Sequence, residues 1–130
     1  CKRARPDIQT PIAYLCTRVA KPAVDDLTKP KQVVCYLRNT RQLALTLEAD
    51  NLQMIKWWVD ASFGVHKDMR SHTGGTMSLG KGSVYSTSVR QKLKTKSSTE
   101  AELVGVDDVM PMILWTRQFM EGQGYDITEN

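Results

Sequence analysis

The sequence contains few cysteines and no long apolar run. Its three cysteines, Cys1, Cys16 and Cys35, have neither an even count nor a CxxC spacing, which argues against a disulfide framework and a cysteine-based zinc site. The apolar neighbours of Cys16 and Cys35 predict ordinary core thiols. No stretch approaches the ~20 apolar residues of a membrane span, and the N-terminus has no apolar signal-type segment. We therefore expect an intracellular protein without a membrane partner. A start on Cys rather than Met indicates a piece of a longer chain.

Acidic and basic residues are unevenly distributed along the chain. Hydrophobic residues make up 41% and charged residues 25% of the 130 residues, as in one globular domain, and the net charge is +4. Residues 67–96 hold seven basic residues and one acid, whereas residues 97–130 hold seven acids and one basic residue. This pattern predicts a basic face that follows a phosphate backbone beside an acidic element that holds cations. Two solvated faces of opposite sign would give the same pattern.

Five basic side chains are the candidates for binding the phosphates of a nucleic acid. The three lysines among them alternate, so in an extended segment they would lie on one side, as a phosphate-tracking row requires. A solvated linker would have the same spacing. The candidates are Arg70, Arg90, Lys92, Lys94 and Lys96.

Two helices and one strand are predicted before residue 50. The first helix spans about residues 10–20, with Pro11 in its first turn. The second spans about residues 25–40 and takes one of the two aspartates at its start as its N-cap. Alternating apolar residues over 43–47 predict a strand, and residues 48–51 predict a turn.

Three antiparallel strands are predicted next. The bulky or β-branched residues Met54, Ile55, Trp57, Trp58 and Val59 predict a largely buried strand that ends on Asp60. The polar residues 64–71 predict a loop. Residues 74–79 and 83–89 predict two hairpin strands joined by a glycine-flanked turn, and the short connections make the three strands antiparallel.

A final helix completes an α+β fold. It is expected to begin near Thr99 and to end near residue 121, because Ser97 with Glu100 and Thr99 with Glu102 both fit the capping box. Pro111 should kink the helix, since it lacks an N–H donor and clashes with the carbonyl four residues earlier. The apolar residues expected on its buried side are Ala101, Val104, Val109, Met112, Ile113, Trp115 and Phe119.

The carboxylates in this arrangement predict a metal site. A helix that crosses back over the sheet can place its first turn near the end of the first long strand, so Asp60 could converge with Glu100 or Glu102. Two convergent carboxylates suit Mg²⁺, and nucleases use a metal pair to hold the attacking water and the leaving oxygen of a phosphodiester. Taken singly, Asp60 also fits a turn, and both glutamates also fit helix caps.

Other polar residues are given structural roles. His66 and His72 fall in or beside the predicted loop and are expected to be exposed. Asp107 and Asp108 lie further along the final helix and are interpreted as solvated charges.

Several motifs, in their order along the chain, resemble the RNase H domain of copia-type long-terminal-repeat retrotransposon Pol polyproteins. They are Trp58-Val59-Asp60-Ala61-Ser62-Phe63, Asp68-Met69-Arg70-Ser71-His72-Thr73-Gly74-Gly75 and Ser97-Ser98-Thr99-Glu100-Ala101-Glu102-Leu103. Upstream, two segments resemble the end of the reverse transcriptase of the same polyproteins. These are Arg5-Pro6-Asp7-Ile8 and Val34-Cys35-Tyr36-Leu37-Arg38-Asn39-Thr40.

The resemblance implies an RNase H-like mixed sheet and cleavage of RNA in RNA–DNA hybrids with two Mg²⁺ ions, or Mn²⁺. It places a catalytic, metal-binding aspartate on Asp60. In this fold the helix glutamate is followed by Leu, any residue and a small residue, which favours Glu102 over Glu100. The family also has an Asp-Asn pair on a further strand, expected here beyond Asn130.

The resemblance further implies two segments: residues 1–50 as the helical end of a reverse transcriptase, and residues 51–130 as the front part of an RNase H domain. The partners would be an RNA–DNA hybrid and the rest of the Pol polyprotein, in cytoplasmic virus-like particles or in the nucleus. This chain alone is expected to be inactive or nearly so. The alternatives are a non-catalytic nucleic-acid-binding connector and a degenerate retroelement relic.

Overall fold

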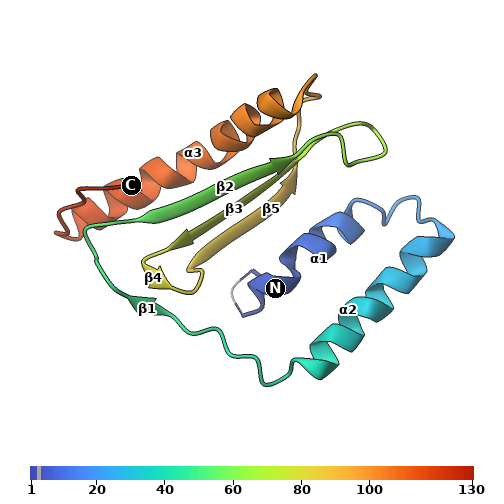
Figure 1. Ribbon diagram of the computed structural model, residues 1–130, viewed down its shortest axis with the longest axis horizontal. Coiled ribbons are helices and arrows are strands. Elements are labelled where there is room, and N and C mark those ends of the chain that lie inside the picture. Colours follow the sequence, from blue (N-terminus) through green and yellow to red (C-terminus); the bar gives the residue numbers. More distant parts are fainter. Residues whose placement is uncertain (3) are drawn as a thin grey trace.

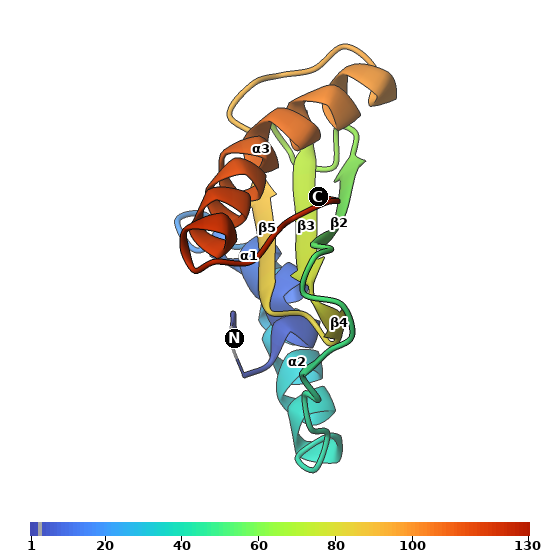
Figure 2. The same cartoon turned by 90° about the vertical axis from the view of Figure 1, so that its left-hand side faces the viewer.

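The computed structural model describes residues 1–2 and 4–130, which form an α+β structure in four layers (Figures 1 and 2). Helix α3 lies on one face of a three-stranded sheet, α1 lies on the other face, and α2 packs outside α1. The predicted α+β class is therefore confirmed. In chain order the elements are η1 (Pro6–Ile8), α1 (Gln9–Cys16), η2 (Val24–Leu27), α2 (Thr28–Asn39), β1 (Glu48–Ala49), β2 (Lys56–Ser62), β3 (His72–Ser78), β4 (Gly80–Lys81), β5 (Tyr85–Arg90) and α3 (Ser98–Gly122).

The main sheet has the order β2-β3-β5, and both pairs are antiparallel as predicted. Asp60 is paired with Gly74, and Gly75 with Thr87. Strand β2 continues to Ser62, so the prediction that it ends on Asp60 is wrong. Since β3 supplies partners for every residue up to Ser62, the ladder carries the aspartate inside the strand.

The strand predicted over residues 43–47 is also wrong. These residues are irregular, and the two-residue strand β1, paired with β4, occupies part of the predicted turn. An alternating pattern makes a strand only when one face is buried against a partner. Leu43 and Leu47 are instead 54% and 56% exposed.

Helix α3 starts where the capping signal placed it. The Ser97 hydroxyl accepts from the Glu100 backbone N–H at 3.1 Å, and the Glu100 carboxylate accepts from the Lys96 N–H at 2.6 Å. The helix then continues through Pro111 to Gly122. One missing N–H removes only one bond of a long ladder, and packing on the sheet holds the rest in place.

The buried face of α3 is built on small residues. Gly105 lies against the sheet, where a Cβ atom would be 3.3 Å from that of Ala61. The prediction of Trp115 and Phe119 as buried is wrong: they stack on each other at 5.2 Å between ring centroids, and each is about half exposed. The residues that α3 does bury are Ala101, Gly105, Val109, Thr116 and Met120. Met120 joins the core cluster with Ile55, Met77 and Ile127.

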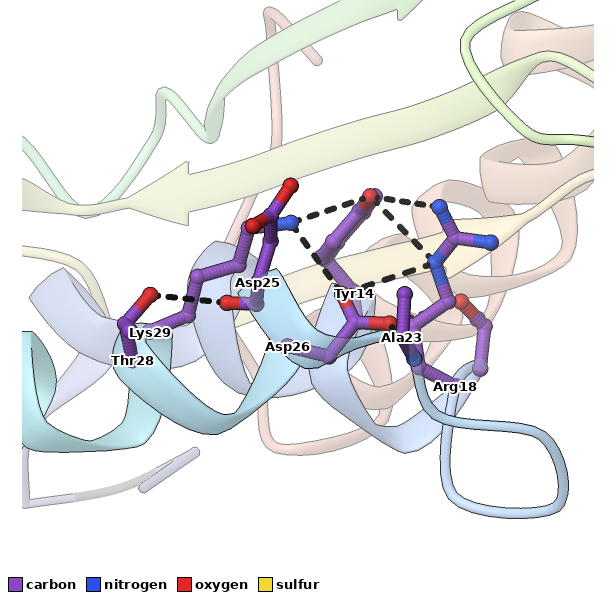
Figure 3. A network of polar contacts seen from close by, with 8 residues as sticks. Tyr14, Arg18, Ala23, Asp25, Asp26, Thr28 and Lys29 are labelled. Carbon is purple, nitrogen blue, oxygen red and sulfur yellow. Dashed lines mark hydrogen bonds and ion pairs between the residues drawn. The ribbon is translucent and has the colours of Figure 1, made fainter.

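A polar network joins α1 to α2 (Figure 3). The Tyr14 hydroxyl accepts hydrogen bonds from Arg18 Nη2 at 2.9 Å and from Lys29 Nζ at 3.5 Å. The buried Asp26 carboxylate accepts from the Ala23 N–H at 2.9 Å and from Lys29 at 3.1 Å, and these contacts lower its pKa. The two helices thus meet through paired charges, and neither cysteine side chain is buried between them.

The cysteine prediction is accordingly wrong, since Cys16 and Cys35 are exposed. Helix α1 packs between the sheet and α2, and α2 packs on α1 and η2, which leaves Cys16 and Cys35 in solvent. Within the described residues, no helix is both long and apolar enough to cross a membrane.

Candidate functional site

Asp60 lies on the face of the sheet that α1 covers. It lines an open cleft of about 320 Å³ together with Gln9 and Thr10 of the α1 segment and Trp58 of its own strand. Its neighbour Ala61 points the other way, toward Gly105 of α3, as alternation along a strand requires. One carboxylate oxygen of Asp60 accepts from the Ala61 N–H at 2.9 Å.

Glu102 is exposed on α3, the helix that covers the opposite face of the sheet. The predicted crossing is present, because α3 begins over the end of β2 and Gly105 packs on Ala61. The elements are therefore brought together, but Asp60 faces the α1 side of the sheet, whereas Glu102 lies on the helix that covers the other side. Their shared role stays a prediction. Glu100 is engaged in capping.

The donor set around Asp60 does not fit a two-metal centre. Among the described residues no group of three or more His, Cys, Asp or Glu side chains is placed to hold a metal ion. The cleft has one acidic residue, Asp60, and its other polar lining residues are neutral: Gln9, Thr10, Thr76, Ser83, Ser86, Thr87 and Ser88. Mg²⁺ is usually held by one or two carboxylates plus substrate phosphates, so further acidic ligands are required for a metal pair.

The two histidines are not exposed loop residues, so that prediction is wrong. His66 is only 6% exposed. Its Nε2 lies 3.0 Å from His72 Nδ1, and His72 Nε2 lies 2.7 Å from the Ser88 hydroxyl. The Tyr14 ring of α1 stacks on His66. Burial lowers the pKa of both imidazoles, and the pair ties the β2–β3 loop to α1.

Asp68 changes the predicted phosphate-binding set. Its carboxylate lies 3.4 Å from Arg70 Nε and 3.2 Å from Arg90 Nη1, so both arginines are partly neutralised. The three lysines of the linker to α3 are exposed, and no ion pair involves them in the part of the chain that the structure describes. They are Lys92, Lys94 and Lys96.

Asp108 is not merely a solvated charge. Its Oδ2 accepts from the Thr73 hydroxyl at 2.9 Å. Gln91, which is 1% exposed, donates through Nε2 to Thr73 Oγ1 at 3.0 Å and to the Ala101 carbonyl at 2.8 Å. This network fastens the end of β5 and the first turns of α3 to the middle strand.

The C-terminal residues run beside the free edge of the sheet. The Ile55 N–H donates to the Glu129 carbonyl at 3.0 Å, and the Thr128 N–H donates to the Gln53 carbonyl at 2.9 Å. Met54 and Glu129 thereby form a parallel bridge just before β2 begins.

Comparison with known proteins gives one relative that bears on these residues. Over 109 residues, 82% of this chain, the sequence is 30% identical to the Saccharomyces cerevisiae protein named "Putative transposon Ty5-1 protein YCL074W". The chain is related to a transposon protein. It spans 35% of the length of that relative. No family model and no solved structure matches the chain.

In this transposon-related chain, three features of the site were not predicted from sequence: the histidine pair, the Asp68 ion pairs and the parallel bridge at Glu129. These contacts mostly join residues far apart in the sequence: the histidine pair spans the β2–β3 loop, Asp68 reaches Arg90 beyond strand β3, and Met54 pairs with Glu129 near the C-terminus. The run Asp68-Met69-Arg70 was the only local signal, because a carboxylate two residues from an arginine can reach it.

Proposed function

We propose that this chain belongs to a retrotransposon Pol polyprotein and spans the junction between its reverse transcriptase and its RNase H domain. Residues 1–50 would be the end of the reverse transcriptase, and residues 51–130 the front of the RNase H domain. Support comes from the transposon relative and from the ordered motifs. The succession of three antiparallel strands and a helix that begins over the first of them also supports it.

The parallel bridge between Met54 and Glu129 is the observation that carries this proposal. A strand that continued in this register would run along the free edge of β2. Asp60 comes six residues after Met54, so the residue about six positions after Glu129 would lie beside it. Paired residues of neighbouring strands point to the same face. An acidic residue there would supply the second carboxylate that the cleft lacks.

The function we propose for the parent protein is metal-dependent hydrolysis of RNA in RNA–DNA hybrids. Asp60 and Glu102 would be catalytic metal ligands, with Mg²⁺ or Mn²⁺ as the cofactor. The partners would be the hybrid and the rest of the polyprotein, in cytoplasmic virus-like particles or in the nucleus. Residues 1–130 alone should not cleave measurably, because one carboxylate in the cleft cannot hold a metal pair.

Two polypeptides test this function: residues 1–130, and a longer piece of the parent that includes the strand beside β2. With Mg²⁺ and a labelled hybrid, only the longer piece should cleave. Asp60→Asn should abolish its activity, whereas Asp107→Asn on the exposed side of α3 should not. Cleavage by residues 1–130 that is lost on Asp60→Asn would show that this chain already holds a complete site. Activity in the longer piece that survives Asp60→Asn would contradict the assignment.

The second candidate is a non-catalytic connector that grips nucleic acid. The exposed linker lysines and the incomplete metal set favour it. This function predicts binding of a hybrid that weakens with salt and is indifferent to both Mg²⁺ and Asp60→Asn. Cleavage by the longer piece would decide against it.

A further inference from the structure

The first 47 residues form a second basic part of the chain, besides residues 67–96. They hold nine basic residues and three acids, whereas residues 97–130 hold one basic residue and seven acids. The two segments form the outermost layers on opposite sides of the sheet, α2 on one side and α3 on the other (Figures 1 and 2). A phosphate backbone would therefore be attracted to the α2 side and repelled from the α3 side.

Helix α2 turns one side toward α1 and the other toward solvent. Lys29, Gln32, Val33 and Tyr36 line a cleft that α2 shares with α1. Residue 31 lies about 160° around the helix from Val33, at 100° per residue. Lys31 and Arg38, seven residues apart, therefore share the outer face and are separated by about 10 Å along the axis. Both are exposed, and the exposed Arg41 follows just past the helix end.

Lys31, Arg38 and Arg41 differ from two other cations of this segment, Arg5 and Lys29, which have acidic partners. Arg5 is paired with Asp7 at 2.7 Å, and Lys29 with Asp26 at 3.1 Å. No ion pair in the described residues involves Lys31, Arg38 or Arg41. Cations without acidic partners can neutralise phosphates and thereby release the counterions condensed on the nucleic acid, and this release drives binding.

We propose that the outer face of α2 binds the phosphate backbone of a nucleic acid through Lys31, Arg38 and Arg41. This site is separate from the linker lysines and deepens the proposed function, on which it rests. It lies on the same side of the sheet as the Asp60 cleft, since α1 covers that cleft and α2 packs on α1. Helices α1 and α2 lie between this outer face and the Asp60 cleft, so the site is a binding site apart from the candidate catalytic aspartate.

Binding of a fluorescent RNA–DNA hybrid of about 20 base pairs, measured by anisotropy from 50 to 200 mM salt, tests the proposal on residues 1–130. The α2 variant carries Lys31→Ala, Arg38→Ala and Arg41→Ala. Its salt slope should be smaller by about three, roughly one per phosphate contact, and its affinity lower by about tenfold or more. The linker variant carries Lys92→Ala, Lys94→Ala and Lys96→Ala.

A matched control removes three cations that have acidic partners. It carries Lys56→Ala, Lys81→Ala and Arg117→Ala, whose partners are Asp50, Glu48 and Glu121. Its net charge changes as much as that of the α2 variant, but its salt slope should change by less than about one. Circular dichroism and the unfolding midpoint confirm that each variant is folded.

Three results would overturn the inference. If the α2 variant binds like the wild type while the linker variant does not, the α2 site is wrong and the proposed function is untouched. If the control loses as much affinity as the α2 variant, net charge rather than this face controls binding. If the wild-type chain does not bind the hybrid at all, both the α2 site and the connector function are rejected.

Discussion

His66 Nε2 and His72 Nδ1 lie 3.0 Å apart, at the place where the β2–β3 loop meets α1. One ring must donate and the other accept, so the contact requires that at least one imidazole be neutral. After burial, which is the largest cause, the positive charges of Arg90 and Arg18 lower the pKa of His66 and the negative charge of Asp68 raises it. His66 in turn lowers the pKa of His72.

This pair predicts that stability falls in mild acid. Burial lowers both folded-state pKa values below the ordinary 6.5, so the unfolded chain takes up protons first as the pH falls. Stability is therefore complete above about pH 6.5 and is lost progressively below it. Urea unfolding at pH 7.5, 6.5 and 5.5 measures the effect. The chain has only these two histidines, so the double variant His66→Gln, His72→Gln should be less sensitive over this range; an unchanged pH dependence would contradict the assignment.

Gly105 allows α3 to approach the sheet. A Val at this position should destabilise the protein by about 2 kcal/mol, since its Cβ atom would crowd Ala61 and its branches would force α3 outward. Gly122 provides the control, because a Cβ atom there has no neighbour within 4 Å. Gly122→Ala should leave the free energy of unfolding within about 0.5 kcal/mol of wild type. Denaturant unfolding compares them, and equal stabilities would show that α3 does not need this approach.

Gln91 holds β3, the end of β5 and α3 together through its buried amide. Gln91→Ala should cost about 2–3 kcal/mol, because it opens a cavity and removes the buried side-chain donor to the Ala101 carbonyl and the Thr73 hydroxyl. The neighbouring exposed Lys92→Ala should change stability by less than about 0.5 kcal/mol. The comparison is made by thermal or urea unfolding. A Gln91→Ala protein as stable as Lys92→Ala would mean that the network is not formed in solution.

Asp68 restrains two arginines that could otherwise contact phosphates. Asp68→Asn keeps the size of the side chain and releases Arg70 and Arg90 from their ion pairs. The affinity for an RNA–DNA hybrid should rise, and the salt slope should increase by about one to two. The anisotropy titration measures both quantities, with Asp107→Asn as a variant of equal charge change. A similar gain in affinity with Asp107→Asn would show that net charge, rather than the release of the two arginines, causes the effect.

The predictable parts of the fold were those with short-range causes. The start of α3 followed from Ser97 and Glu100, whose contact needs only one helical turn. The β3–β5 hairpin followed from its glycine-flanked connection. The prediction of a strand over residues 43–47 was wrong because no neighbouring strand buries its leucines. The prediction that Trp115 and Phe119 are buried was wrong because apolar character alone does not determine which side of a helix packs on the sheet.

The sequence by itself determined the α+β class, the three antiparallel strands, the capped final helix and the segregation of charge, since each depends on residues close together in the chain. Only the tertiary structure decided that Asp60 and α3 belong to opposite faces of the sheet, that two histidines meet against Tyr14, and that Glu129 pairs beside β2. These relations depend on strand register and helix docking. Both are set by packing among distant residues, which no local pattern encodes.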